Sequence, residues 1–128
     1  MTAYARNPDK LAHVKNDNFK VIRGQLEEHT AIESAVRGQD GVFIALGGFG
    51  ILIGDTTCSV GTRAIISAMK KEGVNRMVVC SSWGAGPENR QLLPWFVKLM
   101  LTNPLADKDI QEADISKSGL TYTIVRPP

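Results

Sequence analysis

Short apolar runs recur along the chain, and longer segments in which apolar residues follow a helical period separate most of them. A short, continuous apolar run is typical of a strand that is buried on both faces. Such runs predict strands at residues 2–5, 19–22, 42–46, 76–81 and 122–125. Because helical patterns lie between most of these strands, the sequence predicts an α/β fold with a parallel sheet that helices cover on both faces.

Capping and terminating residues set the limits of the predicted helices. Thr30 and Glu33 have the spacing of a capping box, so one helix is expected to begin near Thr30 and to stop before Gly38. A second helix is expected over residues 61–72, because basic residues and then Gly73 mark its end. The other helical patterns cover residues 91–101, which contain Pro94, and residues 107–118, which Gly119 follows.

Composition and charge narrow the classes of function. The 128 residues suit one domain, and the net charge of +2 comes from 15 basic and 13 acidic residues that are spread along the chain, which argues against nucleic-acid binding. Cys58 and Cys80 are the only cysteines, and no secretory signal is visible, so we expect reduced thiols, no metal site and a cytoplasmic location. The apolar run over residues 41–53 is too short and too interrupted by glycine to span a membrane.

The densest glycine cluster is GGFGILIG, residues 47–54. In the dinucleotide fingerprint GxGxxG, a tight turn after the first strand brings backbone amides and a helix end to the pyrophosphate. Here Gly48, Gly50 and Gly54 give GxGxxxG, and the cluster follows the third predicted strand. We therefore favour an ordinary loop over a pyrophosphate site. A role in a cofactor pocket stays open, because ligands bind at the carboxyl ends of parallel strands.

Five segments together carry a family resemblance: TAYARNPDKL, FKVIRGQL, GQDGVFIALGG, GTRAIISAMKKEGVNRMVVCSS and SGLTYTIVRPP. In this order they resemble the atypical short-chain dehydrogenases that include biliverdin-IXβ reductase (flavin reductase) and the NmrA-like proteins. The resemblance spans nearly the whole chain, and GVNRMVVCSS and SGLTYTIVRP are specific in combination. It implies a Rossmann-like, doubly wound parallel sheet and a single NAD(P)-binding domain over residues 1–128.

Two parts of the family pattern have no counterpart in this chain: the first strand with its glycine-rich turn, which would precede Thr2, and the part after the last strand. We therefore expect a truncated Rossmann-like sheet, incomplete at both ends. In the order 3-2-1-4-5 the first strand sits in the middle, so its neighbours would lie about 10 Å apart, twice the normal spacing. The two half-sheets would then share no ladder, and the chain alone would bind NADPH poorly.

Arg6 stands just past the first predicted strand, where an acid would bind the ribose of NAD and a base would bind the 2′-phosphate of NADP. Arg6, with Lys10 beside it, therefore favours NADPH, as the resemblance also implies; a solvated basic loop is the alternative. By resemblance, Gln25 replaces the family's acid at the adenine edge. The other residues expected along the cofactor are Leu26, Leu46, Gly47, Cys80, Ser81 and Pro127.

Two residues are candidates for the reactive end of the site. Ser82 matches the substrate-side serine of the flavin-reductase branch, where a hydroxyl would orient the acceptor; a simple turn residue is the alternative. Lys108 falls where family members place a lysine or histidine near the nicotinamide ribose, and a solvated residue in the first turn of a helix is the alternative. The Tyr-x-x-x-Lys pair of classical members is absent, since neither Tyr4 nor Tyr122 has a lysine four residues later.

The resemblance implies an NADPH-dependent reductase of the flavin or biliverdin-IXβ reductase type, which transfers a hydride to a planar acceptor, a flavin or a tetrapyrrole. No nucleic acid or membrane partner is expected. One alternative is a non-catalytic NmrA-like module that senses a dinucleotide or binds a protein. Another is an inactive family fragment whose exposed sheet edge favours self-association. Substitution of Ser82 would separate the enzyme from the sensing module, because only the enzyme would lose turnover.

Overall fold

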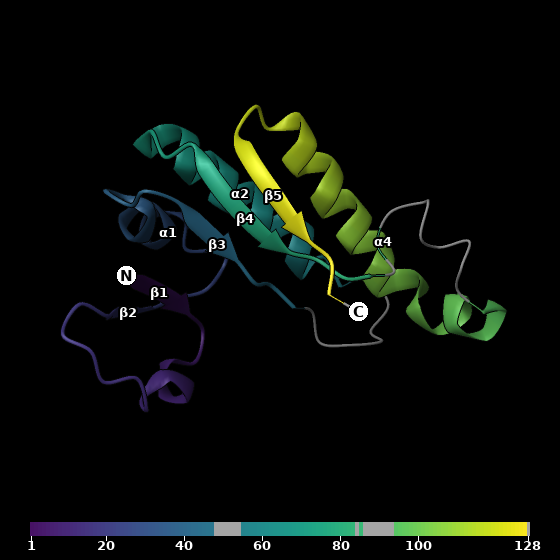
Figure 1. Cartoon of the computed structure of the whole chain (residues 1–128), viewed down its shortest axis with the longest axis horizontal. Coiled ribbons are helices and arrows are strands. Elements are labelled where there is room, and N and C mark those ends of the chain that lie inside the picture. Colours follow the sequence, from purple (N-terminus) through teal and green to yellow (C-terminus); the bar gives the residue numbers. More distant parts are fainter. Residues whose placement is uncertain (48–54, 84, 86–93, 128) are drawn as a thin grey trace.

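Strands and helices alternate along the chain (Figure 1). The computed structural model describes residues 1–47, 55–83, 85 and 94–127, with the backbone alone for residues 97–104. The strands are β1 (Thr2–Ala5), β2 (Lys20–Arg23), β3 (Val42–Ile44), β4 (Arg76–Cys80) and β5 (Thr121–Val125). The helices are α1 (His29–Val36), α2 (Thr57–Glu72) and α4 (Trp95–Lys117), with a 3-10 helix η1 (Pro8–Leu11). The predicted alternation and the predicted strand positions are confirmed, with end points that differ by at most two residues.

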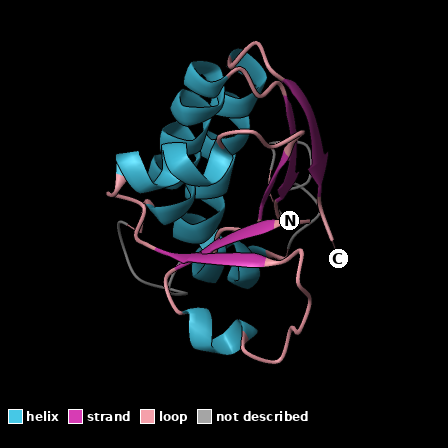
Figure 2. Ribbon diagram, turned by 90° about the vertical axis from the view of Figure 1, so that its left-hand side faces the viewer, coloured by secondary structure: helices cyan, strands magenta, loops and turns pink. Residues whose placement is uncertain are grey.

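The strands form two separate parallel sheets. β1 pairs with β2, and β4 lies between β3 and β5. β1 is the strand nearer to β3 in both ribbon views (Figures 1 and 2), but no ladder joins them among the described residues. The prediction of two half-sheets without a shared ladder is confirmed. The strand order is that of a doubly wound Rossmann-like sheet in which the described residues place no strand between β1 and β3.

The hydrophobic core lies between the three-stranded sheet and the helices. Met77 and Val79 of β4, Met69 of α2 and Ile115 of α4 are all 0% exposed and belong to one buried cluster. Side chains of a strand alternate between its two faces, so only every second residue of β4 enters this core. Figure 2 shows the α-helices on one side of the three-stranded sheet, so the described residues do not show the predicted cover of helices on both faces. On its other side the described residues leave Phe43 of β3 67% exposed.

Helix α1 begins at His29 and ends at Val36, which confirms the predicted start near Thr30 and stop before Gly38, but the predicted capping box is absent. Its N-cap is Glu28, and no side chain caps the first turn. Thr30 is already inside the helix, and Glu33 accepts a hydrogen bond from the Lys71 ammonium of α2 at 2.6 Å. The capping box is absent because Glu28, not Thr30, is the N-cap, and the Glu33 carboxylate instead joins the two helices.

Helix α2 begins at Thr57, a full turn before the predicted start at residue 61. Gly61 lies inside the helix, where a Cβ would come within 2.7 Å of methyl groups of Leu26 and Leu46. The glycine therefore permits close packing and does not start the helix. The predicted end is confirmed, since Gly73 follows with a left-handed φ of 73°.

A single helix, α4, stands where the sequence predicted two. It runs continuously through Pro104 to Lys117, and Gly119 follows with φ 78°, as expected for a helix end. Proline removes one backbone hydrogen bond, but packing of α4 on α2 offsets this loss. Residues 91–93 of the first predicted helix lie outside the described residues. In the part of the chain that the structure describes, no helix has the length and apolar character needed to cross a membrane.

Candidate functional site

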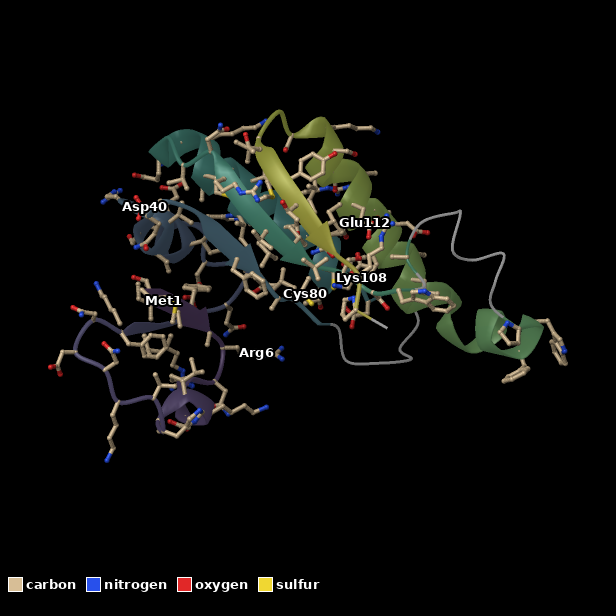
Figure 3. The ribbon with its side chains drawn as sticks, viewed as in Figure 1. Met1, Arg6, Asp40, Cys80, Lys108 and Glu112 are labelled. Atoms are coloured by element: carbon tan, nitrogen blue, oxygen red, sulfur yellow. The ribbon has the colours of Figure 1, made fainter. Side chains whose placement is uncertain are left out.

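A polar cavity of about 300 Å³ borders the carboxyl ends of β1 and β2. Arg6 directly follows β1, and Arg23 is the last residue of β2 and pairs with Ala5. The parallel register therefore brings the two arginines to the same sheet edge. Figure 3 shows Arg6 at this edge of the small sheet, and Cys80 and Lys108 at the carboxyl end of the larger sheet. The cavity is lined by Arg6, Arg23, Gly24, Gln25 and Glu28.

Tyr4 and Gly24 fix the chain beside this cavity. The Tyr4 hydroxyl donates a hydrogen bond to the Gln25 carbonyl at 2.7 Å. A Cβ at position 24 would lie 2.1 Å from the Tyr4 hydroxyl oxygen, so glycine is required there. Burial, together with the carboxylates of Glu28 and Glu27, raises the pKa of Tyr4, which keeps its hydroxyl a donor.

Lys108 joins the carboxyl ends of β3 and β4. Its ammonium nitrogen donates to the Leu46 carbonyl at 3.0 Å and to the Cys80 carbonyl at 3.2 Å. Leu46 lies just past β3, and Cys80 is the last residue of β4. The cation therefore fixes the spacing of the two strand ends at the edge where the sequence predicted the reactive end of the site.

A polar network lies beyond β4 and β5. The Ser81 hydroxyl donates to Glu112 Oε1 at 2.6 Å, and the Arg126 guanidinium donates to Oε1 and Oε2 at 3.0 and 2.5 Å. Burial alone would raise the pKa of Glu112, but hydrogen bonds from Arg126 and Ser81 and the charges of Arg126 and Lys108 lower it. Glu112 is therefore an ionised carboxylate, only 8% exposed, that connects α4 to the two strand ends.

Asp107 caps the amino end of α2. Its two carboxylate oxygens accept hydrogen bonds from the backbone amides of Cys58 and Ser59 at 2.8 and 3.1 Å. Amides at a helix start are the groups that would otherwise bind an anion. The glycine cluster before this helix, from residue 48 to residue 54, lies outside the described residues. A protein carboxylate therefore engages these two amides in the described part of the chain.

Cys58 does not have the environment of a reactive thiol. Burial first, and the Asp107 carboxylate second, raise the pKa of Cys58 above its ordinary value, although Lys108 opposes them. The Cys58 thiol donates to the Leu46 carbonyl at 3.5 Å. Cys80 is half-buried at the end of β4. A protonated, packed thiol is a poor nucleophile, so Cys58 contributes packing to this edge of the sheet.

The residues predicted for the adenosine half of a cofactor lie in two places. Arg6 and Gln25 line the same cavity. The Leu26 side chain instead lies beside Gly61 of α2. Lys10 is exposed in η1 and is not among the residues that line this cavity.

The residues predicted for the nicotinamide half of the cofactor lie near the ends of β3, β4 and β5. Ser82 is half-buried, and its carbonyl accepts a hydrogen bond from the Ala85 amide at 3.0 Å. Its hydroxyl makes no hydrogen bond to the described part of the chain. The Pro127 carbonyl accepts a hydrogen bond from the Trp83 amide at 3.1 Å, which ties the segment after β5 to the one after β4. Gly47 is exposed.

Sequence reasoning missed the polar residues that organise this edge. Asp107, Gln111 and Glu112 lie on the inner face of α4 and are each at most 8% exposed. Gln111 donates to the Thr62 hydroxyl at 2.8 Å. A signal was present, because these residues share a helical spacing with the apolar Ile115, which places them on the core side. Arg23 was missed because it lay just past the predicted strand over residues 19–22 and is separated from Arg6 in sequence by η1 and most of β2.

Comparisons with known proteins give the family and the fold of this chain. The chain matches the NAD(P)H-binding family along residues 1–128. The anaerobillin reductase ChuY of Escherichia coli O157:H7 has a TM-score of 0.80 at 23% identity, covering 98% of this chain and 59% of that one. A Rossmann-fold NAD(P)-binding family protein of Shigella flexneri has a TM-score of 0.72 at 29% identity, covering 98% and 52%. A short-chain dehydrogenase/reductase of Veillonella parvula DSM 2008 in complex with NADP has a TM-score of 0.71 at 18% identity, covering 98% and 55%. The chain therefore spans between half and three fifths of the length of these proteins.

Proposed function

Because the chain belongs to the NAD(P)H-binding family, we propose that it binds NADPH across the carboxyl ends of its strands and carries the activity of a flavin or biliverdin-IXβ type reductase. The observation that carries this proposal is the cavity in which Arg6 and Gln25 meet beside β1 and β2. Ligands of parallel α/β sheets bind at this edge. The adenosine half of the cofactor would occupy the cavity, and the nicotinamide would face the ends of β3 and β4.

The residues of the cavity fit the adenosine half of NADPH. The Arg6 guanidinium can bind a phosphate through two parallel hydrogen bonds, and the Gln25 side chain can both donate and accept at an adenine edge. The cavity volume of about 300 Å³ is at the lower limit for small-molecule sites, which run to roughly 1,000 Å³. It therefore suits one half of a dinucleotide rather than the whole.

At the reactive end, this chain would orient the reactants. When bound, NADPH supplies a hydride to the planar acceptor, which takes up a proton from solvent while the cofactor leaves as NADP⁺. The Ser82 hydroxyl would hydrogen-bond a carbonyl or ring nitrogen of the acceptor. Lys108 is held by two carbonyls, so it would position the ends of β3 and β4 rather than donate a proton.

We expect the chain alone to bind NADPH weakly. The amides of Cys58 and Ser59, which could otherwise meet a pyrophosphate, are engaged by Asp107. Much of the affinity would then come from the adenosine half. Titrations with NADPH and with NADH, followed by nucleotide fluorescence and thermal unfolding together, test this. We expect saturable binding with a preference for NADPH; a flat response to both nucleotides would contradict the proposal.

Turnover is tested separately from binding. Purified protein with NADPH would be assayed against a flavin and against biliverdin, as the wild type, as Ser82→Ala and as Ser67→Ala. Ser67 is an exposed residue of α2 and serves as the matched control. We expect Ser82→Ala to lose most of the turnover with unchanged NADPH affinity, and Ser67→Ala to behave as the wild type. Equal turnover of all three proteins would remove Ser82 from the mechanism.

A second candidate function is a dinucleotide-binding module without catalysis. It is favoured by the internal hydrogen bonds of Ser81 and Lys108, which commit both side chains to holding the fold. Such a module would respond to NADPH in the binding titrations yet show no acceptor-dependent oxidation of it. Self-association through the edges of β1 and β3 is a further part of this proposal, and a second species in size-exclusion chromatography with multi-angle light scattering would support it.

A further inference from the structure

We infer that Arg23, rather than Lys10, is the second cation that binds the 2′-phosphate of NADPH together with Arg6. This inference rests on the proposed function and assigns the residues that select the phosphorylated cofactor. Arg6 and Arg23 both line the cavity, whereas Lys10 does not. The ladder pair between Ala5 and Arg23 sets this arrangement, because Arg6 is the next residue after Ala5.

The charges that line the cavity favour a dianion. Arg6 and Arg23 bring two positive charges and Glu28 brings one negative charge, so the lining carries a net charge of +1 (2 − 1). A phosphate monoester carries about two negative charges at neutral pH. A guanidinium presents its donors in a planar fork that matches two phosphate oxygens. Two guanidinium groups at one sheet edge would hold the phosphate from two sides.

The backbone beside Arg23 is held in place, so its side chain starts from a fixed position. The Gly24 amide donates to the Ala5 carbonyl at 3.2 Å, which extends the β1–β2 ladder past Arg23. The Tyr4 hydroxyl holds the Gln25 carbonyl at 2.7 Å. The two residues after Arg23 are therefore anchored, and the ladder pair of Tyr4 with Ile22 holds the residue before it, which lowers the entropy cost of ordering the arginine on a ligand.

The Arg23 side chain is exposed and makes no hydrogen bond or ion pair with the described part of the chain. Binding a phosphate would therefore break no existing interaction of Arg23. A guanidinium that joins two strands or two helices would have to give up such an interaction first. Arg126, which is bound to Glu112, illustrates that contrasting case.

The test uses adenosine 2′,5′-bisphosphate and adenosine 5′-monophosphate as probes, because they differ only in the 2′-phosphate. Calorimetric titrations would compare the wild type with Arg23→Gln, Arg6→Gln, Lys10→Gln and Lys20→Gln. Lys20 is the exposed first residue of β2, at the opposite end of the strand from Arg23, and is the matched control. Circular dichroism and thermal unfolding would establish that each variant is folded.

We expect Arg23→Gln and Arg6→Gln each to weaken binding of the 2′,5′-bisphosphate about tenfold or more while binding of the 5′-monophosphate changes little. Lys20→Gln should match the wild type. A loss in Lys10→Gln without a loss in Arg23→Gln would overturn the inference and restore Lys10 as the second cation. The inference would also be overturned if inorganic phosphate displaced the 2′,5′-bisphosphate as well as the nucleotide itself does, because the site would then bind any phosphate.

Failure of the inference can be told apart from failure of the proposed function. If the wild type binds NADPH and NADH equally well, the inference is wrong and nucleotide binding stands. If the wild type binds neither dinucleotide nor either probe, both are wrong. If Arg23→Gln keeps its preference for NADPH while Arg6→Gln loses it, Arg6 acts alone and only the inference fails.

Discussion

The two sheets have the same parallel geometry but bury very different amounts of side chain. No residue of β1 or β2 is fully buried, whereas Met77 and Val79 of β4 are 0% exposed and Ile44 of β3 is 2% exposed. A two-stranded sheet is marginally stable by itself, so the small sheet depends on packing against α1 and on its hydrogen bonds. The larger sheet therefore contributes the buried strand residues of the core, and the smaller sheet presents a charged cavity at its edge.

The comparison is tested most severely by removing one apolar side chain from each sheet. Met77→Ala should lower the free energy of unfolding by about 2–5 kcal/mol, because it opens a cavity in the centre of the core. Val21→Ala of β2 should cost at most about 1 kcal/mol, since Val21 is already 36% exposed. Urea unfolding measures both values. Equal losses would show that the two sheets share one core.

A smaller effect is expected from Asp107→Ala. The substitution leaves the amides of Cys58 and Ser59 buried and without their acceptor, which should cost about 1–3 kcal/mol. Asp40→Ala, in an exposed position, is the matched control and should change stability by less than about 0.5 kcal/mol. Thermal unfolding of the two variants checks this. A loss no larger than that of the control would mean that Asp107 contributes nothing as a cap.

The network at Glu112 predicts a dependence of stability on acid pH. The pKa of Glu112 is lowered in the folded protein, so its stabilising effect is complete above the ordinary value of 4.5 and is lost as pH falls through the lowered pKa. Glu112→Gln should remove that part of the pH dependence and cost on the order of 1 kcal/mol at neutral pH. Urea unfolding at a series of pH values measures it.

Glu72 is a carboxylate at the protein surface that can be compared with the buried Glu112. The hydrogen bond from Arg37 is the main cause that lowers the pKa of Glu72, but this pair lies on the outside of α1 and α2. Glu72→Gln should therefore change the same pH profile less than Glu112→Gln does. If the two variants lost equal amounts, burial of the Glu112 network would have no energetic consequence.

The smallest effect is expected in the small sheet itself. Tyr4→Phe removes the hydrogen bond from the tyrosine hydroxyl to the Gln25 carbonyl. This should lower the free energy of unfolding by at most about 1 kcal/mol. The amide of Gln25 should exchange faster with solvent, while amides of β4 keep their protection. Hydrogen exchange followed by NMR would measure this contrast. Faster exchange throughout β4 would mean that the two sheets unfold as one unit.

The elements were predictable from the sequence because their signals are local. Apolar runs gave the strands, and Gly73 and Gly119 marked the helix ends. The errors arose where distant contacts decide the outcome. The capping box failed because α1 starts before Thr30, and Glu33 then joins α1 to Lys71 of α2. The start of α2 was placed late because Gly61 looks like a helix breaker unless Leu26 and Leu46 are known to lie against it.

The candidate site was predictable at its ends but not in its centre. Arg6 and Gln25 follow strands, and the carboxyl ends of parallel strands indicate a ligand edge without further information. The hydrogen-bond partners of Glu112 and Asp107 lie in other elements, so no local sequence pattern identifies these partners. Whether Ser82 and Lys108 take part in a reaction stays a prediction. The same holds for Leu26, Leu46, Gly47, Cys80, Ser81 and Pro127 as cofactor contacts.

The cap of α2 also sets an order of events during folding. Asp107 follows Cys58 by 49 residues, so the amides of Cys58 and Ser59 lack their acceptor until α4 has been synthesised and has docked, although Asp55 already accepts from the Thr57 amide. The amides of Cys58 and Ser59 should therefore gain protection late, after the rest of α2, in pulse-labelled refolding. On the ribosome, the chain up to β4 would emerge with this helix end frayed, and completion of the domain would wait for the last third of the polypeptide.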